Sequence, residues 1–494
     1  MSLSPRFLLP AALALAACSA SEPLAIFGAA KVADKADDTV GSLRAGPALW
    51  DDPQNTPHPM FNWPTLSHPP AAAKVPAYWV PPPARALPGT VSGIRHLTRA
   101  DEIPRGAGLA AFGSLIVLPG FGSDSSVIDI RDPARPKRLS TFGDNGANFE
   151  SAAADPEVAQ RGHVDLESRM LGADRGAAII AYPSGRLVTV LSTSSEIESW
   201  DITDPAEPRP LPPLVVPNSH KLGVVPGTPL VYNAGSRGGG QAGNLMGTDH
   251  TEIFDLSDPD DPQFVQDFQN GYSCHHIFFW NNPQQNKFRA ICAGVEVTQI
   301  WDTADPRNPK VIVTLPVHHG VPGTPSAAVL VRVPGVIAIA EAFSHSAGLN
   351  RAGDILYVGD ENGGGGLPPG CVASVATPAG DISAPIGAIW FYDISTETSP
   401  RLKGWWSAAN NPTQKSATAT CTAHHGRLVP DPDRDLLAMA FYGDGVILID
   451  FSNPMLPRAV GQFVESSNTW EAWYYNGYLF TGDLARGLDV LTFD

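Results

Sequence analysis

Histidine recurs in this chain at the start of short apolar runs. The fragments SHKLGVVPG, CHHIFFWNN, VHHGVPGTP and AHHGRLVPD place a first histidine at matching positions, namely His220, His275, His318 and His424. Neutral imidazole is a good ligand for Cu, Fe and Zn ions, and a site without thiolates fits these metals better than Mg or Ca. If the four runs are strands that approach a common axis, the sequence predicts that their first histidines ligate one metal ion.

Three of the fragments carry a second histidine directly after the first: His276, His319 and His425. Lys221 takes this place after His220. Successive side chains on a strand point to opposite faces, so only one member of each pair can point inward. We expect the second histidines to support the first ones or to pack between strands. The simplest alternative for every one of these histidines is a hydrogen-bonded packing residue.

Other candidates for chemistry are few. Glu296, in AGVEVTQIWD, could face the same axis or point outward. Asp360 and Glu361, in GDENGGGG, could bind a cation or cap their loop. The glycine-rich GSRGGGQAG lacks the strand–loop–helix context and the Lys-Ser/Thr of a phosphate-binding loop. The chain has no G-x-S-x-G motif and no convincing nucleophile–base set, so catalytic residues cannot be assigned from the sequence.

The elements that must position these histidines are repeated. Six fragments share an apolar run, an aspartate and a proline seven residues later: VIDIRDPARP, SWDITDPAEP, IFDLSDPDDP, IWDTADPRNP, FYDISTETSP and LIDFSNPMLP. We expect a strand to end at each aspartate, whose carboxylate caps the following turn. The prolines exclude a helix there and stop the strand ladder. With the runs upstream, each repeat supplies about four strands, which is a propeller blade.

A further partial copy ends the chain at residues 470–494 and lacks its outer strand. The segment SGIRHLTRA at 92–100 resembles the outer strands of the other repeats. Joining it to the last copy would close the ring and remove the open sheet edges. We predict an all-β fold, a seven-bladed β-propeller over residues 93–494 that is closed by an N-terminal strand.

The repeats resemble the LVIVD repeat, which is named for the apolar strand before the aspartate. The tail from CTAHHGRLVP onward and the segment DENGGGGLPPGC are similar to exported bacterial proteins that carry this repeat. This resemblance implies a β-propeller of the cell envelope but no established activity. The histidines give a looser similarity to metal-binding propellers, among them carotenoid cleavage oxygenases, which hold iron through one histidine from each of four blades, and selenium-binding proteins. The chain lacks the full motif set of either group.

The N-terminus predicts export. MSLSPRFLLPAALALAACSAS combines one Arg, an Ala/Leu-rich core and small residues before Cys18, as in a secretory signal peptide. LAAC resembles a bacterial lipobox, which implies residues 1–18 as the signal and lipidation of Cys18. The alternative is an ordinary signal peptide cut near Ala17 or Ala20. Residues 19–92, rich in Pro and Ala, then form a tether that is extended or disordered.

Four cysteines remain after Cys18, namely Cys274, Cys292, Cys371 and Cys421, and in an exported chain they suggest two disulfides. Three connectivities are possible. Cys274 and Cys292 could face each other across adjacent strands, which would leave Cys371 with Cys421.

Charge and composition narrow the function. The 494 residues include 47 Gly and 48 Pro, as expected for a fold rich in turns. The formal net charge is −17 and no basic run is present, which excludes a basic patch for nucleic acid. We expect the protein to contact a membrane only through its lipid anchor. Two functions fit: an envelope protein that binds a protein, glycan or small molecule around a histidine-lined centre, or a Cu- or Fe-dependent oxidoreductase.

Overall fold

The computed structural model divides the chain into Met1–Ser42 and Leu43–Asp494. It describes residue 58 and, with gaps, the chain from 77 to the C-terminus. The described ranges are 77–103, 105–120, 123–143, 176–193, 196–235, 249–294, 297–316, 330–333, 336–339, 344–361, 374–376, 383–385, 387–408, 421–465 and 468–494.

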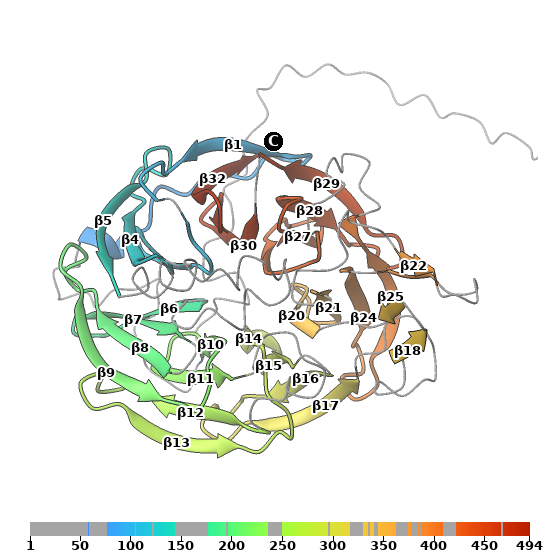
Figure 1. The fold of residues 1–494 in the computed structure, drawn as a ribbon, viewed down its shortest axis with the longest axis horizontal. Coiled ribbons are helices and arrows are strands. Elements are labelled where there is room, and N and C mark those ends of the chain that lie inside the picture. Colours follow the sequence, from blue (N-terminus) through green and yellow to red (C-terminus); the bar gives the residue numbers. More distant parts are fainter. Residues whose placement is uncertain are drawn as a thin grey trace, which may run out of the picture. The chain divides into compact units, whose positions relative to one another are not determined.

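Seven four-stranded antiparallel sheets are arranged as a β-propeller, which confirms the predicted fold (Figure 1). Blades 1 to 6 each run from an inner to an outer strand in chain order. The strands of blades 1 to 3 are β2 (Ala110–Phe112), β3 (Leu115–Leu118), β4 (Ser125–Asp129) and β5 (Lys137–Phe142); β6 (Gly176–Ala181), β7 (Leu187–Ser192), β8 (Glu196–Asp201) and β9 (Arg209–Val215); and β10 (Lys221–Val224), β11 (Leu230–Ala234), β12 (Thr251–Asp255) and β13 (Gln263–Phe268).

The strands of blades 4 to 6 are β14 (His276–Asn282), β15 (Lys287–Ala293), β16 (Val297–Asp302) and β17 (Lys310–Pro316); β20 (Ser344–Leu349), β21 (Ile355–Asp360), β24 (Ile389–Asp393) and β25 (Arg401–Trp406); and β26 (Gly426–Val429), β27 (Leu436–Ala440), β28 (Val446–Asp450) and β29 (Arg458–Phe463). Four short strands form two separate hairpins, β18 (Leu330–Val333) with β19 (Val336–Ile339) and β22 (Ser374–Ala376) with β23 (Ser383–Pro385). The described helices are the one-turn η2 (Ala77–Trp79) and η3 (Pro283–Gln285), and none of them has the length and apolar character needed to cross a membrane.

Blade 7 joins the two ends of the propeller. It contains β30 (Thr469–Tyr475), β31 (Tyr478–Asp483) and β32 (Gly487–Phe493), and its outer strand is β1 (Ile94–Arg99). Ile94 pairs with Phe493 and Arg99 with Asp489, so the segment predicted to close the ring does so. His96 adds a contact of 2.8 Å between its Nε2 and the Asp489 carboxylate. The last sheet therefore has no missing outer strand.

The repeated aspartates act as predicted. At Asp129, Asp201, Asp255, Asp302, Asp393 and Asp450, the main-chain N–H two residues later donates to the carboxylate at 2.8 to 3.1 Å. Each of these residues ends the third strand of its blade. A short acidic side chain is favoured there because its carboxylate accepts a hydrogen bond from a turn N–H that no longer has a partner in the strand ladder. The repeat motif thus encodes the turn between the third and outer strands.

One of these turns gives a measurable pH dependence. The main-chain N–H and the hydroxyl of Ser395, followed by Lys403, lower the pKa of Asp393 from 3.8 to about 2. Because the carboxyl pKa is lower in the folded state, ionised Asp393 stabilises the fold fully above about pH 4, and this contribution is lost as the pH falls toward 2. Asp393→Asn keeps a turn acceptor but removes the charge. We expect the difference in unfolding free energy between wild type and variant to shrink between pH 5 and pH 2; a constant difference would contradict this.

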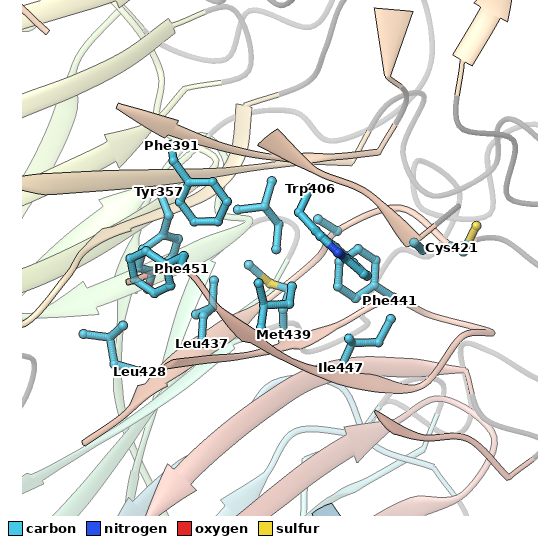
Figure 2. Packing of buried hydrophobic residues seen from close by; sticks show 14 residues of the cluster. Tyr357, Phe391, Trp406, Cys421, Leu428, Leu437, Met439, Phe441, Ile447 and Phe451 are labelled. Atoms are coloured by element: carbon cyan, nitrogen blue, oxygen red, sulfur yellow. The ribbon is translucent and has the colours of Figure 1, made fainter. Parts of the chain in front are cut away.

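The core consists of apolar clusters between neighbouring blades. Figure 2 shows the cluster between blades 5 and 6, where Tyr357 and Phe391 meet Leu437 and Phe451. The rings of Phe391 and Phe451 stack with centroids 5.0 Å apart. Similar clusters lie between the other blade pairs. Burial between blades holds each inner strand in place, so residues at the starts of these strands have fixed positions.

Part of the segment predicted as a tether contacts the propeller. His58 is buried, and its ring hydrogen-bonds at 2.9 Å to the carbonyl oxygen of Thr303 in blade 4. The Trp79 ring meets Phe112 of blade 1 edge-on, with centroids 5.2 Å apart. Leu87 and Val91 are buried in the cluster between blades 6 and 7. The rest of 19–76, the signal segment and Cys18 lie outside the described residues.

Candidate metal centre

Four consecutive blades each place one histidine at the start of their inner strand. His220 and His275 directly precede β10 and β14, His345 is the second residue of β20, and His424 lies two residues before β26. Three of them are fixed by a main-chain hydrogen bond to the second strand of their own blade. The N–H of His220 donates to Ala234 O (2.8 Å), that of His275 to Ala293 O (2.6 Å) and that of His424 to Ala440 O (2.9 Å). The β-ladder therefore fixes the main-chain position from which each of these three imidazoles extends.

The four rings lie next to one another in blade order. Their centroids are 3.6 Å apart between His220 and His275, 4.5 Å between His275 and His345, and 4.1 Å between His345 and His424. None of the four side chains is exposed. The structure thus brings together three histidines of the predicted set, His220, His275 and His424, and adds His345.

A second row follows one residue later along the chain. The His276 ring lies 4.8 Å from the His425 ring, and His425 lies 4.4 Å from His345 and 4.3 Å from His424. His425 is buried, with 1% of its surface exposed, and His276 is half-buried. The second histidines of two fragments therefore join the same cluster rather than packing elsewhere.

Two groups of three histidines could each hold a metal ion. In one, ligand nitrogens of His220, His275 and His345 all lie within 4.8 Å of one another; in the other, those of His345, His424 and His425 do. His345 belongs to both groups. The described part of the chain therefore offers five imidazoles with nitrogens close enough to share metal ions, and His276 next to them.

Glu361 brings a carboxylate to these imidazoles. It follows β21 directly and is fully buried. Its Oε2 lies 3.3 Å from Nε2 of His345, and its Oε1 lies 3.6 Å from Nε2 of His424. The hydroxyl of Tyr442 donates to Oε1 and fixes the carboxylate. Of the pair predicted as a cation-binding loop, Glu361 joins the histidine cluster, while Asp360 is the buried last residue of β21.

Hydrogen bonds set which ring nitrogen faces Glu361. Nδ1 of His424 contacts the carbonyl oxygen of Trp470, and Nδ1 of His345 lies 3.4 Å from the carbonyl oxygen of His424. A carbonyl only accepts, so Nδ1–H is the donor and Nε2 carries the lone pair. Two acceptors, Nε2 and a carboxylate oxygen, then face each other at both histidines. A cation between them resolves this conflict.

The distances fit that cation. Two ligand atoms that each lie about 2.1 Å from one ion are roughly 3.0 to 3.5 Å apart. The contacts of 3.3 and 3.6 Å between Nε2 atoms and Glu361 are close to this range. A backbone carbonyl on Nδ1 is the usual outer partner of a metal-binding histidine, because it orients the ring and fixes its tautomer. The residues present therefore fit a transition-metal ion.

Burial keeps the imidazoles in the form that binds metals. Desolvation is the largest cause that lowers the pKa values of His276, His345, His424 and His425 well below 6.5. The positive charge of Lys221 lowers the pKa of each of them further. All four rings are neutral near pH 7, so no proton competes with a metal ion for their lone pairs.

A small cavity adjoins this centre. It has a volume of about 190 Å³ and is bounded by the inner strands β2, β6, β10, β14, β26 and β30. Phe278 and Trp473 contribute apolar surface, and the guanidinium of Arg427 lies 3.4 Å from the Trp473 ring centroid. Lys221 and His276, which directly follow two histidines of the first row, also line it. The cavity thus reaches the second row of histidines.

A buried ion pair borders the cavity. Nζ of Lys221, from blade 3, lies 2.8 Å from Oε2 of Glu471, from blade 7. Both side chains are almost fully buried, at 4% and 6% exposure. Oε2 also accepts the main-chain N–H of Leu109, at 3.2 Å. This pair connects non-adjacent blades across the centre of the propeller.

The cysteines within the described residues are held in disulfides, so they do not offer thiolate ligands. Cys274 and Cys292 form a disulfide with Cα atoms 5.3 Å apart, which is the pairing that the sequence favours. Cys421 is also disulfide-bonded. Cys371, His318, His319 and Glu296 lie outside the described residues. The described centre is therefore made of imidazoles and a carboxylate.

Sequence reasoning missed His345. Its fragment, FSHSAGLNRAGDILYVGD, has one histidine and no doubled pair. The signal that identifies His345 is its distance along the chain from the second strand of its blade. One short strand and a turn separate His345 from β21, as they separate His220 from β11. His318 is separated from that strand by a much longer segment.

In comparisons with known proteins, no protein-family model matches the chain, and no curated protein matches it significantly.

Proposed function

We propose that this propeller is a metalloprotein that holds a transition-metal centre among its inner strands and uses it as an oxidoreductase on a small molecule. The observation that carries the proposal is the pair of contacts between Glu361 and the Nε2 atoms of His345 and His424. Two buried acceptors that face each other, backed by Nδ1–carbonyl contacts, are stable when a cation lies between them.

The donor set favours iron or copper, with zinc as the third fit. Imidazole nitrogens with one carboxylate suit these ions, and hard cations such as Mg²⁺ prefer oxygen ligands. Iron or copper would supply one-electron and oxygen chemistry at the centre. The protein residues orient the ligands, exclude bulk water by burial, and keep the imidazoles neutral. Two histidines and a carboxylate also match the ligand types of non-haem iron oxygenases.

The adjoining cavity supports a small substrate. Phe278 and Trp473 would contact its apolar part, and Arg427 and Lys221 would attract a polar or anionic group. His276 lines the cavity and contacts the ring of His425, so a bound molecule would lie one residue layer from the metal ligands. The same cavity favours the second candidate function, an envelope protein that binds a small molecule without turning it over.

Metal analysis tests the proposal directly. We expect the purified mature protein, after loading with Fe(II), Cu or Zn and removal of loosely bound ions, to retain at least about one ion per chain. His250→Ala is the matched control, because His250 belongs to neither group of three histidines and contacts Asp249 instead. Retention below about 0.2 ions per chain for every metal would exclude a metal centre. Oxygen uptake with small phenols or thiols that disappears in His345→Ala would separate an enzyme from a binding protein.

We further propose that the protein is exported, carries LVIVD-type repeats and is anchored to the cell envelope through lipidated Cys18. The signal-like N-terminus and the disulfide Cys274–Cys292 support export, because disulfides persist in oxidising compartments. Cys18→Ser should move the protein from the membrane fraction to the soluble fraction of the envelope. A variant that stays in the membrane fraction would show that Cys18 is not the anchor.

A further inference from the structure

The centre has more ligands than one ion needs. Five buried imidazoles and one half-buried imidazole, that of His276, form one continuous cluster: His220, His275, His276, His345, His424 and His425. Glu361 adds two carboxylate oxygens. Zinc takes four ligands, and the other first-row ions take four to six. Resting on the proposed metal centre, we propose that this cluster binds two metal ions, bridged by Glu361.

The ligand groups divide in two. His220, His275 and His345 form one group, and His345, His424 and His425 form the other. Because one imidazole nitrogen binds one ion, His345 can complete only one of the groups, and Glu361 can complete the other. We assign His345, through its Nε2, to the first ion, because Glu361 can take its place in the second group. The second ion then has His424, His425 and Glu361.

His425 is the residue that one ion leaves unexplained. It is buried, and among the described residues neither of its ring nitrogens has a hydrogen-bond partner. Leaving one buried polar atom without a partner carries a desolvation penalty. Nδ1 of the neighbouring His276 is in the same condition. A second ion beside His425 would give one of its nitrogens a ligand bond and remove this penalty.

The two oxygens of Glu361 face different histidines. Oε2 is the oxygen near His345 and Oε1 the one near His424. A carboxylate placed in this way can bind one ion with each oxygen. Tyr442 donates to Oε1, which keeps the carboxylate plane from rotating. In two-metal sites the ions lie about 3.5 to 4 Å apart, a separation that one carboxylate spans.

Lys221 does not prevent a second cation. Its ammonium group lies 2.8 Å from the Glu471 carboxylate, which offsets part of the positive charge that the histidines experience. The cluster itself supplies one carboxylate, Glu361, from the described residues. An imidazole-rich set with little negative charge suits copper, which binds imidazole well in both of its common oxidation states. Copper is therefore the probe for the test.

The test is copper stoichiometry. Purified protein is loaded with copper, passed over a chelating resin, and analysed for copper and protein. We expect two copper ions per chain in wild type and in the His250→Ala control, and one in His425→Ala. One ion per chain in wild type would overturn the two-ion inference and leave the proposed function standing. Fewer than about 0.2 would overturn both.

A measurement on wild type alone guards against a variant that fails to fold. X-ray absorption of the copper-loaded protein should show a copper–copper distance of about 3.5 to 4 Å. In the Cu(II) form, magnetic coupling should reduce the electron paramagnetic resonance signal well below the total copper content. A full mononuclear signal, with no copper–copper scattering at a loading of two ions, would place the second ion elsewhere and contradict the inference.

Discussion

His345→Ala is expected to weaken metal binding at least about 100-fold. His345 belongs to both groups of three histidines, and its Nε2 lies 3.3 Å from Glu361. Losses of 10- to 100-fold are usual for residues that only orient a ligand, so loss of a ligand itself should cost more. The measurement is a titration against a chelator of known affinity, which gives the dissociation constant for Cu(II) or Fe(II).

His318→Ala is the informative comparison. The sequence predicts His318 as the ligand from this part of the chain, whereas the inner strand of blade 5 carries His345. We expect His318→Ala to bind metal as tightly as wild type. Equal losses in both variants would show that His318 also reaches the centre. Loss in His318→Ala alone would contradict the assignment of His345.

The repeat motif explains why the fold could be predicted from sequence. Each aspartate caps its turn through a main-chain N–H two residues later, a local interaction that depends on neighbours in sequence and not on the rest of the fold. Local chemistry of this kind is visible in a single chain. The closing strand could be found for a similar reason, since the last repeat lacked an outer strand and the segment 92–100 resembled one.

The histidine cluster was only partly predictable because it depends on strand register. Three histidines stand at the starts of regular inner strands, where alignment of the repeats finds them. The register between β20 and β21 shifts between Ser344 and Ser346, which marks a bulge at His345. A bulge adds one residue and redirects its side chain, so simple alternation does not indicate where it points. The same irregularity occurs at Trp470 in blade 7, whose ring packs against His424.

Glu361 shows a second limit of sequence reasoning. The pattern predicts a cation-binding or loop-capping role for Asp360 and Glu361, but it contains nothing about their partners. Those partners, His345, His424 and Tyr442, come from two other inner-strand starts and a distant turn. The contact with His345 forms within blade 5, where β20 pairs with β21, and the contacts with His424 and Tyr442 form only when blade 6 packs beside blade 5. Residue types were therefore predictable, and their combination was not.

Breaking the buried pair of Lys221 and Glu471 should cause the largest loss of stability. Lys221→Met leaves the Glu471 carboxylate buried without its counter-charge, and removing one partner of a buried pair typically costs about 3 to 5 kcal/mol. Glu471→Gln should cost less stability. The amide oxygen can still accept the hydrogen bond from the N–H of Leu109, and the ammonium group of Lys221, left without its counter-charge, is carried by a long flexible side chain. Urea denaturation of each variant at pH 7, without added metal, measures the free energy of unfolding.

The double variant, Lys221→Met with Glu471→Gln, separates charge from packing. It removes both charges and keeps side chains of similar size, and neutral replacements of buried pairs are often close to neutral in stability. We expect it to recover most of the loss seen in Lys221→Met, and the double-mutant cycle then gives the coupling between blades 3 and 7. If the two single losses simply added, the pair would contribute no coupling energy. The contact across the propeller centre would then be a consequence of ring closure and not one of the interactions that hold the histidine-bearing strands in place.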